Sequence, residues 1–138
     1  MVGVMRALLA FVALASVVLC AAAPALAASR TGTSGPDRFI GTPQADRFDG
    51  RGGGDVLIGN GGRDRLVGGA GADTLVGGRG GDLVLGGSGR DTVAAGGGND
   101  RIGVRGGGAD RVSCGPGRDV VSADGRDSIA GDCEVVRR

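Results

Sequence analysis

The 138-residue sequence has no tryptophan, tyrosine, histidine or lysine, and its only aromatic residues are three phenylalanines. So few large side chains do not build an ordinary globular core, and the length allows one domain at most. Without histidine or lysine, general acid–base catalysis by these side chains is excluded, and we expect no enzymatic activity. The sixteen basic residues are all arginines, set against fourteen aspartates and one glutamate, for a formal net charge of +1.

Glycine is the residue that the sequence has in excess. There are 32 glycines, almost a quarter of the chain. Glycine at this density is typical of disordered segments or of fibrous and solenoid repeats. Whether the glycines are periodic therefore decides between disorder and a fold.

Residues 1–27 have the features of a secretory signal peptide. Arg6 gives a positive start, residues 7–20 are almost entirely apolar, and Pro24 precedes a small-residue cleavage site at 25–27. The alternative is a transmembrane anchor, but the apolar run is short of the ~20 residues that a spanning helix needs. We expect a secreted protein, extracellular or associated with the cell envelope, that begins near residue 28.

The chain after the signal peptide is electrically neutral. Loss of Arg6 leaves fifteen arginines and fifteen acidic residues. A neutral chain has no bulk attraction to nucleic acid or to an anionic membrane, so we expect neither as a partner. Many arginines directly precede or follow an aspartate, and we interpret them as a solvated face that balances charge and weakens the attraction of cations.

The glycines and aspartates repeat every nine residues. Aspartates occur at this spacing without a slip from Asp37 to Asp100, and then after ten, nine and eight residues at Asp110, Asp119 and Asp127. Two residues after each aspartate is an apolar side chain: Phe39, Phe48, Leu57, Leu66, Leu75, Val84, Val93, Ile102, Val112, Val121 and Ile129. The unit is G-G-x-G-x-D-x-U-x, where U is apolar, which predicts a short turn followed by a three-residue strand.

This unit resembles the haemolysin-type, or repeat-in-toxin (RTX), calcium-binding repeat of exported bacterial proteins. The resemblance covers about residues 32–130 and is most faithful over 59–100, whereas the unit at 41–46 lacks two glycines. It implies an all-β fold, a right-handed parallel β-roll in which two nonapeptides form each turn and several calcium ions bind between the turns. The ending around the cysteine pair is similar to that of small secreted members.

The residue chemistry agrees with calcium sites at the turns. Glycine adopts backbone angles with positive φ that let carbonyls converge, and calcium takes six to eight oxygen ligands. With eighteen residues per turn, aspartates eighteen apart stack ~4.8 Å from each other, and two stacked loops share an ion. The expected ladders are Asp37, Asp55, Asp73 and Asp91 on one edge, and Asp46, Asp64, Asp82 and Asp100 on the other. The glycines expected to contribute carbonyls are Gly59, Gly61, Gly68, Gly69, Gly71, Gly77, Gly78, Gly80, Gly86, Gly87 and Gly89.

The composition also predicts that calcium is needed for folding. The single row of inward apolar side chains buries too little surface to offset the conformational entropy of a glycine-rich chain. Stacked carboxylates without a cation repel each other. We therefore expect a chain that is disordered without calcium and ordered with it.

Two cysteines, Cys114 and Cys133, remain after the signal peptide is removed. Their spacing of nineteen residues is close to one solenoid turn, which brings them into disulfide range. A redox pair or a metal thiolate site are the alternatives, but no third cysteine or histidine accompanies them. The expected organisation is a short linker at 28–36, a calcium-binding roll at 37–113, and degenerate repeats with a disulfide-closed cap at 114–138.

The outer face of the roll is the other candidate surface. Val56, Ile58 and Val76 are expected to point outward and form an apolar strip that docks a cell-wall or protein partner. In this rival interpretation the protein is an interaction module and calcium is only structural.

Overall fold

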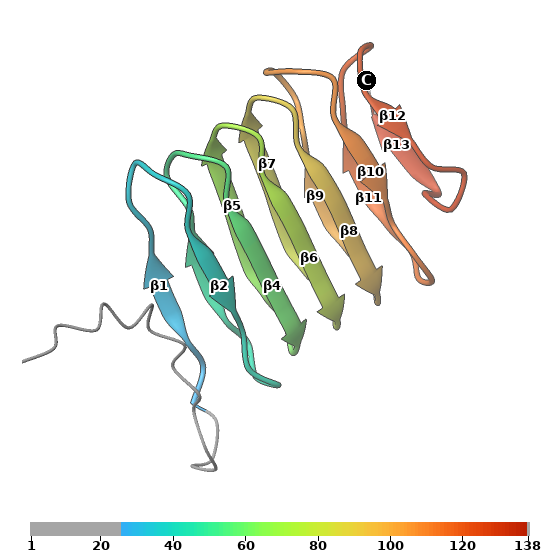
Figure 1. Ribbon diagram of the computed structural model, residues 1–138. Coiled ribbons are helices and arrows are strands. Elements are labelled where there is room, and N and C mark those ends of the chain that lie inside the picture. The colour runs from blue at the N-terminus through green and yellow to red at the C-terminus, as the bar shows by residue number, and fades with distance from the viewer. Residues whose placement is uncertain (1–25, 138) are drawn as a thin grey trace, which may run out of the picture.

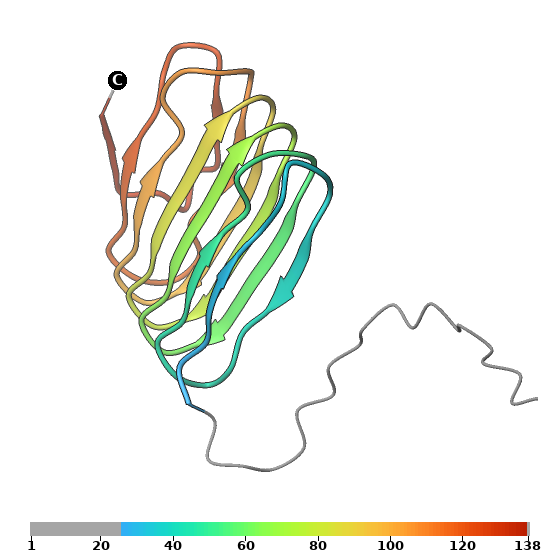
Figure 2. The same ribbon diagram turned by 90° about the vertical axis from the view of Figure 1, so that its left-hand side faces the viewer.

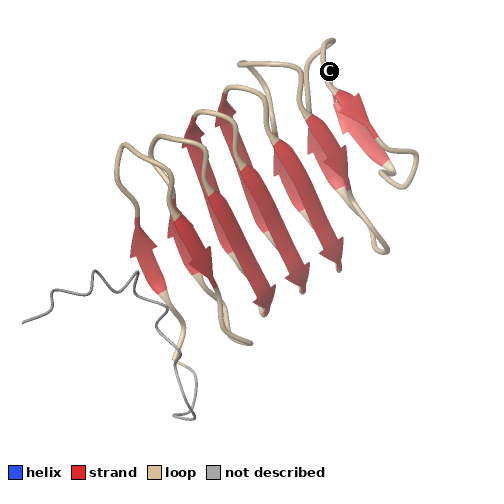
Figure 3. Ribbon diagram, viewed as in Figure 1, coloured by secondary structure: helices blue, strands red, loops and turns tan. Residues whose placement is uncertain are grey.

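A computed structural model describes residues 26–137 of the chain. The expected signal peptide, residues 1–27, lies almost wholly outside this range. The described part is all-β and contains no helix, hence none long and apolar enough to cross a bilayer. Figure 3 shows strands joined by loops throughout this part.

Thirteen strands form two parallel sheets (Figure 1). One sheet has the order β1-β3-β5-β7-β9-β11-β13, and the other has the order β12-β10-β8-β6-β4-β2. The strand bounds are β1 Ser29–Thr31, β2 Arg38–Ile40, β3 Arg47–Asp49, β4 Val56–Gly61, β5 Arg65–Ala70, β6 Thr74–Arg79, β7 Leu83–Ser88, β8 Thr92–Gly97, β9 Arg101–Gly103, β10 Arg111–Ser113, β11 Val120–Ser122, β12 Ser128–Ile129 and β13 Val135–Arg137.

Odd and even strands alternate between the sheets, so two nonapeptides complete one turn of a solenoid of about six turns. Figure 2 shows the coils stacked side by side. Partners along a sheet are eighteen residues apart, as in Arg47 with Arg65 and Leu57 with Leu75. The predicted all-β parallel solenoid with two nine-residue units per turn is confirmed.

The core is a single column of apolar side chains between the sheets. Strands β2 to β12 each place an apolar residue in or against this column, and Leu57, Leu66 and Leu75 are fully buried. Phe39 and Phe48 pack at 5.6 Å between ring centroids near the amino-terminal end of the column. Toward the carboxyl end, further inward side chains replace glycine at the first position of the unit, namely Ala95, Val104, Cys114 and Ala123.

The central strands are longer than the three residues that the sequence predicts. Strands β4 to β8 each have six residues, because pairing continues into the glycines, as between Gly69 and Gly87. Without side chains, the glycine loops of neighbouring turns approach closely enough to pair. Gly69 has φ 110° and its Cβ would collide with the Arg51 carbonyl, so glycine is required there.

The two ends of the roll depart from the regular repeat. Residues 28–36, expected as a linker, contain β1, which pairs with β3. At the other end the partner spacing changes from eighteen to nineteen between β8 and β10, and to seventeen between β10 and β12. The extra residue lies in the loop before Asp110, so the aspartate keeps its place in the stack.

Candidate metal sites

The aspartates of the repeat form two ladders along the edges of the roll. In each ladder the backbone N–H of one aspartate donates to Oδ1 of the aspartate one turn later. These distances are 2.8 Å for Asp55 to Asp73, 3.0 Å for Asp73 to Asp91 and 2.8 Å for Asp64 to Asp82. The stacking at eighteen residues that the sequence predicts is therefore present.

The second carboxylate oxygen of most ladder aspartates is buried and has no hydrogen-bond partner. This holds for Oδ2 of eight residues, namely Asp55, Asp64, Asp73, Asp82, Asp91, Asp100, Asp110 and Asp119. An unpaired buried carboxylate oxygen destabilises a fold, so eight of them in two rows fit binding sites for cations.

Burial also changes the acidity of these groups. Desolvation raises the pKa of Asp64, Asp91 and Asp100 to about 6, against an opposing hydrogen bond from the backbone. Neighbouring carboxylates raise these pKa values further, as Asp82 and Asp46 do for Asp64. The ladders are thus rows of carboxylates held close together without a countercharge.

Glycines at the first position of the unit leave space for the unpaired oxygens. A Cβ at Gly68 would collide with Oδ2 of Asp73 and with the carbonyl oxygen of Gly86 in the next turn. Gly59 and Gly77 have equivalent surroundings. Carboxylate and carbonyl oxygens from two turns therefore converge where a side chain would otherwise lie.

Glycines at the fourth position supply a second set of carbonyls. Gly71 and Gly80 have positive φ, 127° and 124°, and each lies against the carbonyl oxygen of the fourth residue in the previous turn. Among the described residues, the carbonyls of Gly53, Gly62, Gly71 and Gly80 accept no backbone hydrogen bond. Oxygens of this kind are what hard cations such as calcium bind.

The predicted glycines fall into these positions with one difference. Gly59, Gly68, Gly77 and Gly86 occupy the first position, Gly69, Gly78 and Gly87 the second, and Gly71, Gly80 and Gly89 the fourth. In the unit from 59 to 67, however, the glycine with positive φ is Gly62, whereas the predicted Gly61 is paired within β4. Gly61 and Gly62 are adjacent in the sequence, and the pairing register of β4 distinguishes them.

The first two predicted aspartates have different surroundings from the rest. Thr42 donates its backbone N–H to Oδ2 of Asp46 at 2.6 Å, and its hydroxyl lies 3.2 Å from the same oxygen. Thr33 makes the matching contacts to Asp37, at 2.6 and 3.1 Å. The turns at 32–37 and 41–46 thus satisfy their own carboxylates.

Four acidic residues outside the predicted set extend the ladders. Asp110 and Asp119 are buried with an unpaired Oδ2. Asp127 accepts the N–H of Asp110, and Glu134 accepts the N–H of Asp119 at 2.8 Å. The repeat of the aspartates beyond residue 100 was the available signal for the first three, whereas nothing in the spacing indicated Glu134.

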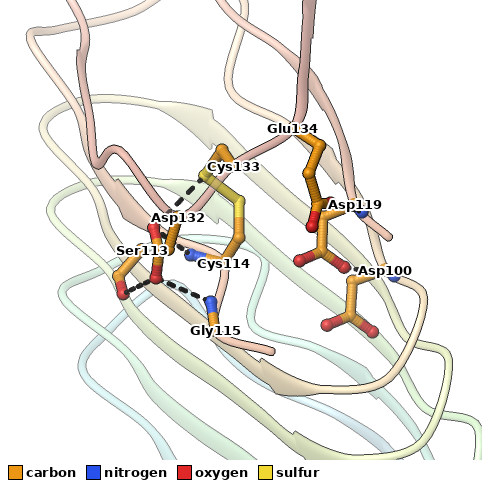
Figure 4. The surroundings of a disulfide bond; sticks show 8 residues. All are labelled: Asp100, Ser113, Cys114, Gly115, Asp119, Asp132, Cys133 and Glu134. Carbon is orange, nitrogen blue, oxygen red and sulfur yellow. Dashed lines mark hydrogen bonds between the residues drawn. A yellow bond between two sulfur atoms is a disulfide. The ribbon is translucent and has the colours of Figure 1, made fainter. Parts of the chain in front are cut away.

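The cysteines form the predicted disulfide, Cys114–Cys133, with 5.2 Å between the Cα atoms. Figure 4 shows it beside Asp132, whose carboxylate accepts the N–H of Gly115 and the hydroxyl of Ser113. The two cysteine sulfurs and the Asp132 carboxylate lie together, but the sulfurs are bonded to each other and are not free as metal ligands. The group is a structural cap.

The sequence matches one family of known proteins. Residues 31–66, 50–84 and 67–102 each match the family model described as the RTX calcium-binding nonapeptide repeat (4 copies). Together these matches span more than half of the chain. No curated protein and no solved structure matches it.

Proposed function

The chain belongs to the RTX calcium-binding nonapeptide repeat family, and from this premise we propose that it is a secreted protein that folds when calcium fills its aspartate ladders. The observation that carries the proposal is the set of eight buried Oδ2 atoms without a partner. A cation beside each of these oxygens supplies the charge and the coordination that the protein itself lacks.

The ligands proposed for calcium are oxygens of two consecutive turns. Oδ2 of each ladder aspartate contributes the carboxylate, and the fourth-position carbonyls, such as those of Gly62 and Gly80, contribute neutral oxygens. The turns between Asp55 and Asp100 have the most complete set of glycines. Asp37 and Asp46 were also predicted as ligands, and their threonine contacts leave them the weakest candidates.

Folding on binding follows from the same burial. Closing the roll without calcium buries rows of carboxylates whose pKa values burial has raised, so ionised side chains oppose closure near neutral pH. The core that opposes this cost is a single column of mainly aliphatic residues. Calcium binding energy is therefore folding energy.

Secretion accounts for the dependence of folding on calcium. The expected signal peptide exports the chain, and calcium is scarce inside cells and abundant outside. A chain that stays open before export and closes afterwards fits these two conditions. We propose no catalysis for it, because most of the acidic residues are committed to the ladders and the sequence has no histidine or lysine.

A calcium titration of the chain from residue 28 onward tests the proposal. Far-UV circular dichroism is expected to show β structure in calcium and its loss in excess chelator. The same β content in both conditions contradicts folding on binding.

Calorimetry tests the shared sites separately. Four orphaned aspartates in each ladder leave three gaps per ladder, so about six ions are expected if adjacent turns share one ion. A stoichiometry near one excludes this arrangement.

The rival role as an interaction module depends on the outer face of the even-numbered sheet. Val56, Ile58 and Val76 are half-buried there, and Ile40 beside Ile58 is 52% exposed. A partner for this face stays a prediction. Charged substitutions at Ile58 and Val76 that abolish capture by cell-wall material, with calcium binding intact, favour this role.

A further inference from the structure

Positive and negative charges occupy different parts of this molecule. Of the fourteen arginines within residues 26–137, thirteen are exposed and Arg65 is half-buried, whereas ten of the fifteen acidic residues are buried. The charged groups acting on the pKa values of Asp64, Asp91 and Asp100 are other carboxylates, not arginines. The described residues, with nearly equal numbers of arginines and acidic residues, therefore have a cationic exterior around an anionic interior.

Alternation along the strands produces this segregation. From Asp46 onward each ladder aspartate points inward, held through Oδ1 by the previous turn, so the residue directly after it points outward. Arg47, Arg65 and Arg101 each follow a ladder aspartate of the odd-numbered sheet.

Five arginines gather along one edge of that sheet, and we call them the arginine edge: Arg47, Arg63, Arg65, Arg101 and Arg118. Arg47, Arg65, Leu83 and Arg101 are consecutive register partners on β3, β5, β7 and β9, which are neighbouring strands of that sheet. These residues follow the solenoid axis with a rise of ~4.8 Å per turn.

A groove lies in the middle of the arginine edge. Arg63, Arg65 and Arg101 line it together with Asn99. Arg63 Nε donates to the Gly81 carbonyl at 3.2 Å, and Gly81 also lines the groove, so this hydrogen bond holds the guanidinium beside it. Two aspartates at its base, Asp64 and Asp82, are buried ladder residues.

We propose that the arginine edge binds a linear acidic polysaccharide along the solenoid axis when the ladders are loaded with calcium. Guanidinium groups bind carboxylates through paired hydrogen bonds, and a row of them matches a polymer that carries one carboxylate after another. The proposal rests on the proposed function for its calcium dependence.

The same surface argues against nucleic acid as the ligand. Single-stranded nucleic acids are bound by aromatic side chains that stack on bases. Phe39 and Phe48 are the only aromatic side chains within the described residues, and both pack against the core. The row is also straight and single, without an element that would enter a duplex groove. A sugar polymer needs neither feature.

Calcium controls this surface through charge. In the calcium-free chain, the ladder carboxylates of the same edge cancel the field of the arginines, and the row itself is not assembled. In the folded, loaded roll the carboxylates are neutralised and the arginines remain. By linkage, the polysaccharide then raises calcium affinity by the same factor by which calcium raises polysaccharide affinity.

Binding of fluorescent hyaluronate oligosaccharides tests the inference, because this polymer carries carboxylates. The triple variant R63Q/R65Q/R101Q is expected to bind about tenfold more weakly than the wild type in calcium, from the loss of three charged contacts. The matched control is R90Q/R111Q/R126Q, which removes the same charge from the other edge and is expected to change affinity less than about threefold. Equal losses in the two variants overturn the arginine edge as the site.

Further binding measurements identify the ligand class and the role of calcium. Neutral dextran or a DNA duplex that binds as tightly as hyaluronate overturns the polysaccharide assignment. Wild-type affinity is expected to fall as salt rises, and an affinity independent of salt overturns the role of charge without any variant. Circular dichroism of the same samples separates the two proposals: a chain that calcium orders but that does not bind hyaluronate refutes this inference alone. A chain that calcium does not order refutes the proposed function.

Discussion

At the scale of single residues, the two oxygens of a ladder aspartate have separate roles. Oδ1 joins consecutive turns through a backbone hydrogen bond, and it is Oδ2 that lacks a partner. An asparagine side chain keeps one oxygen for the first role. An NH2 group replaces the second oxygen, and its partly positive hydrogens repel a cation. The two roles are therefore separable by substitution.

Asp82→Asn is expected to remove about two calcium ions from the stoichiometry, because Asp82 lies between two other orphaned aspartates of its ladder, Asp64 and Asp100. Asp46→Asn in the same ladder is the control, since Thr42 already satisfies Oδ2 of Asp46. Calorimetric titration of both variants measures the difference. Equal stoichiometries for the two variants contradict the assignment of Oδ2 as the calcium ligand.

Protons are expected to replace calcium in part. The pKa values of Asp64, Asp91 and Asp100 are raised in the folded state from 3.8 to about 6, so protonation favours folding. This contribution is complete below pH ~4 and is lost as the pH rises through about 6. The calcium-free chain is thus expected to gain β structure on acidification from pH ~7 to ~5, measured by circular dichroism in metal-stripped buffer. Loss of β structure in that range contradicts the burial of these carboxyls.

At the scale of strands and turns, the fourth-position glycine determines whether consecutive loops stack. Gly71 has φ 127°, and a Cβ there would collide with the carbonyl oxygen of Gly53. That carbonyl is also one of the proposed calcium ligands. Stacking and metal binding therefore have the same requirement at this position.

Gly71→Ala is expected to destabilise the calcium-loaded roll by more than about 1 kcal/mol, from backbone strain and displaced carbonyls. The control is Gly125→Ala, where a Cβ would meet nothing within 4 Å. The calcium concentration at the midpoint of folding, followed by circular dichroism, is measured for both variants. A midpoint for Gly71→Ala equal to that of Gly125→Ala rules out the steric requirement.

The nine-residue period was enough to predict most of these elements. A constant spacing assigns every apolar residue to the column and every aspartate to an edge, so the two sheets and the ladders followed from counting. The period did not predict β1, because Ser29–Thr31 contains no aspartate or glycine signal. It also did not predict the threonine contacts to Asp37 and Asp46, or that Glu134 closes a ladder, because these depend on where side chains point.

At the scale of the whole molecule, the roll is one-dimensional, and each turn contacts only its neighbours. The ends are therefore the weakest places, and the disulfide cap protects one of them. Reduction of Cys114–Cys133 is expected to lower the free energy of unfolding in calcium by about 3 kcal/mol, for a loop of about this length. Denaturant titration with and without reductant measures this, with the Cys114→Ser/Cys133→Ser variant as the matched control.

Calcium stoichiometry distinguishes a cap from a metal site in the same experiment. Asp132, the acidic residue beside the disulfide, has both carboxylate oxygens hydrogen-bonded, so the number of bound ions is expected to stay the same after reduction. A gain or loss of ions on reduction contradicts a purely structural role for the cysteines.

The ladder hydrogen bonds all have the same direction along the chain. In each of them an earlier turn gives its N–H and a later turn brings the carboxylate, from Asp37 through Asp110. The first turns also satisfy their own carboxylates through Thr33 and Thr42. A chain delivered amino end first, as every ribosome delivers it, therefore presents its self-sufficient turns before any others. Each newly arriving turn then completes the one that came before it, so under the proposed export the order of emergence coincides with the order in which the turns become able to close.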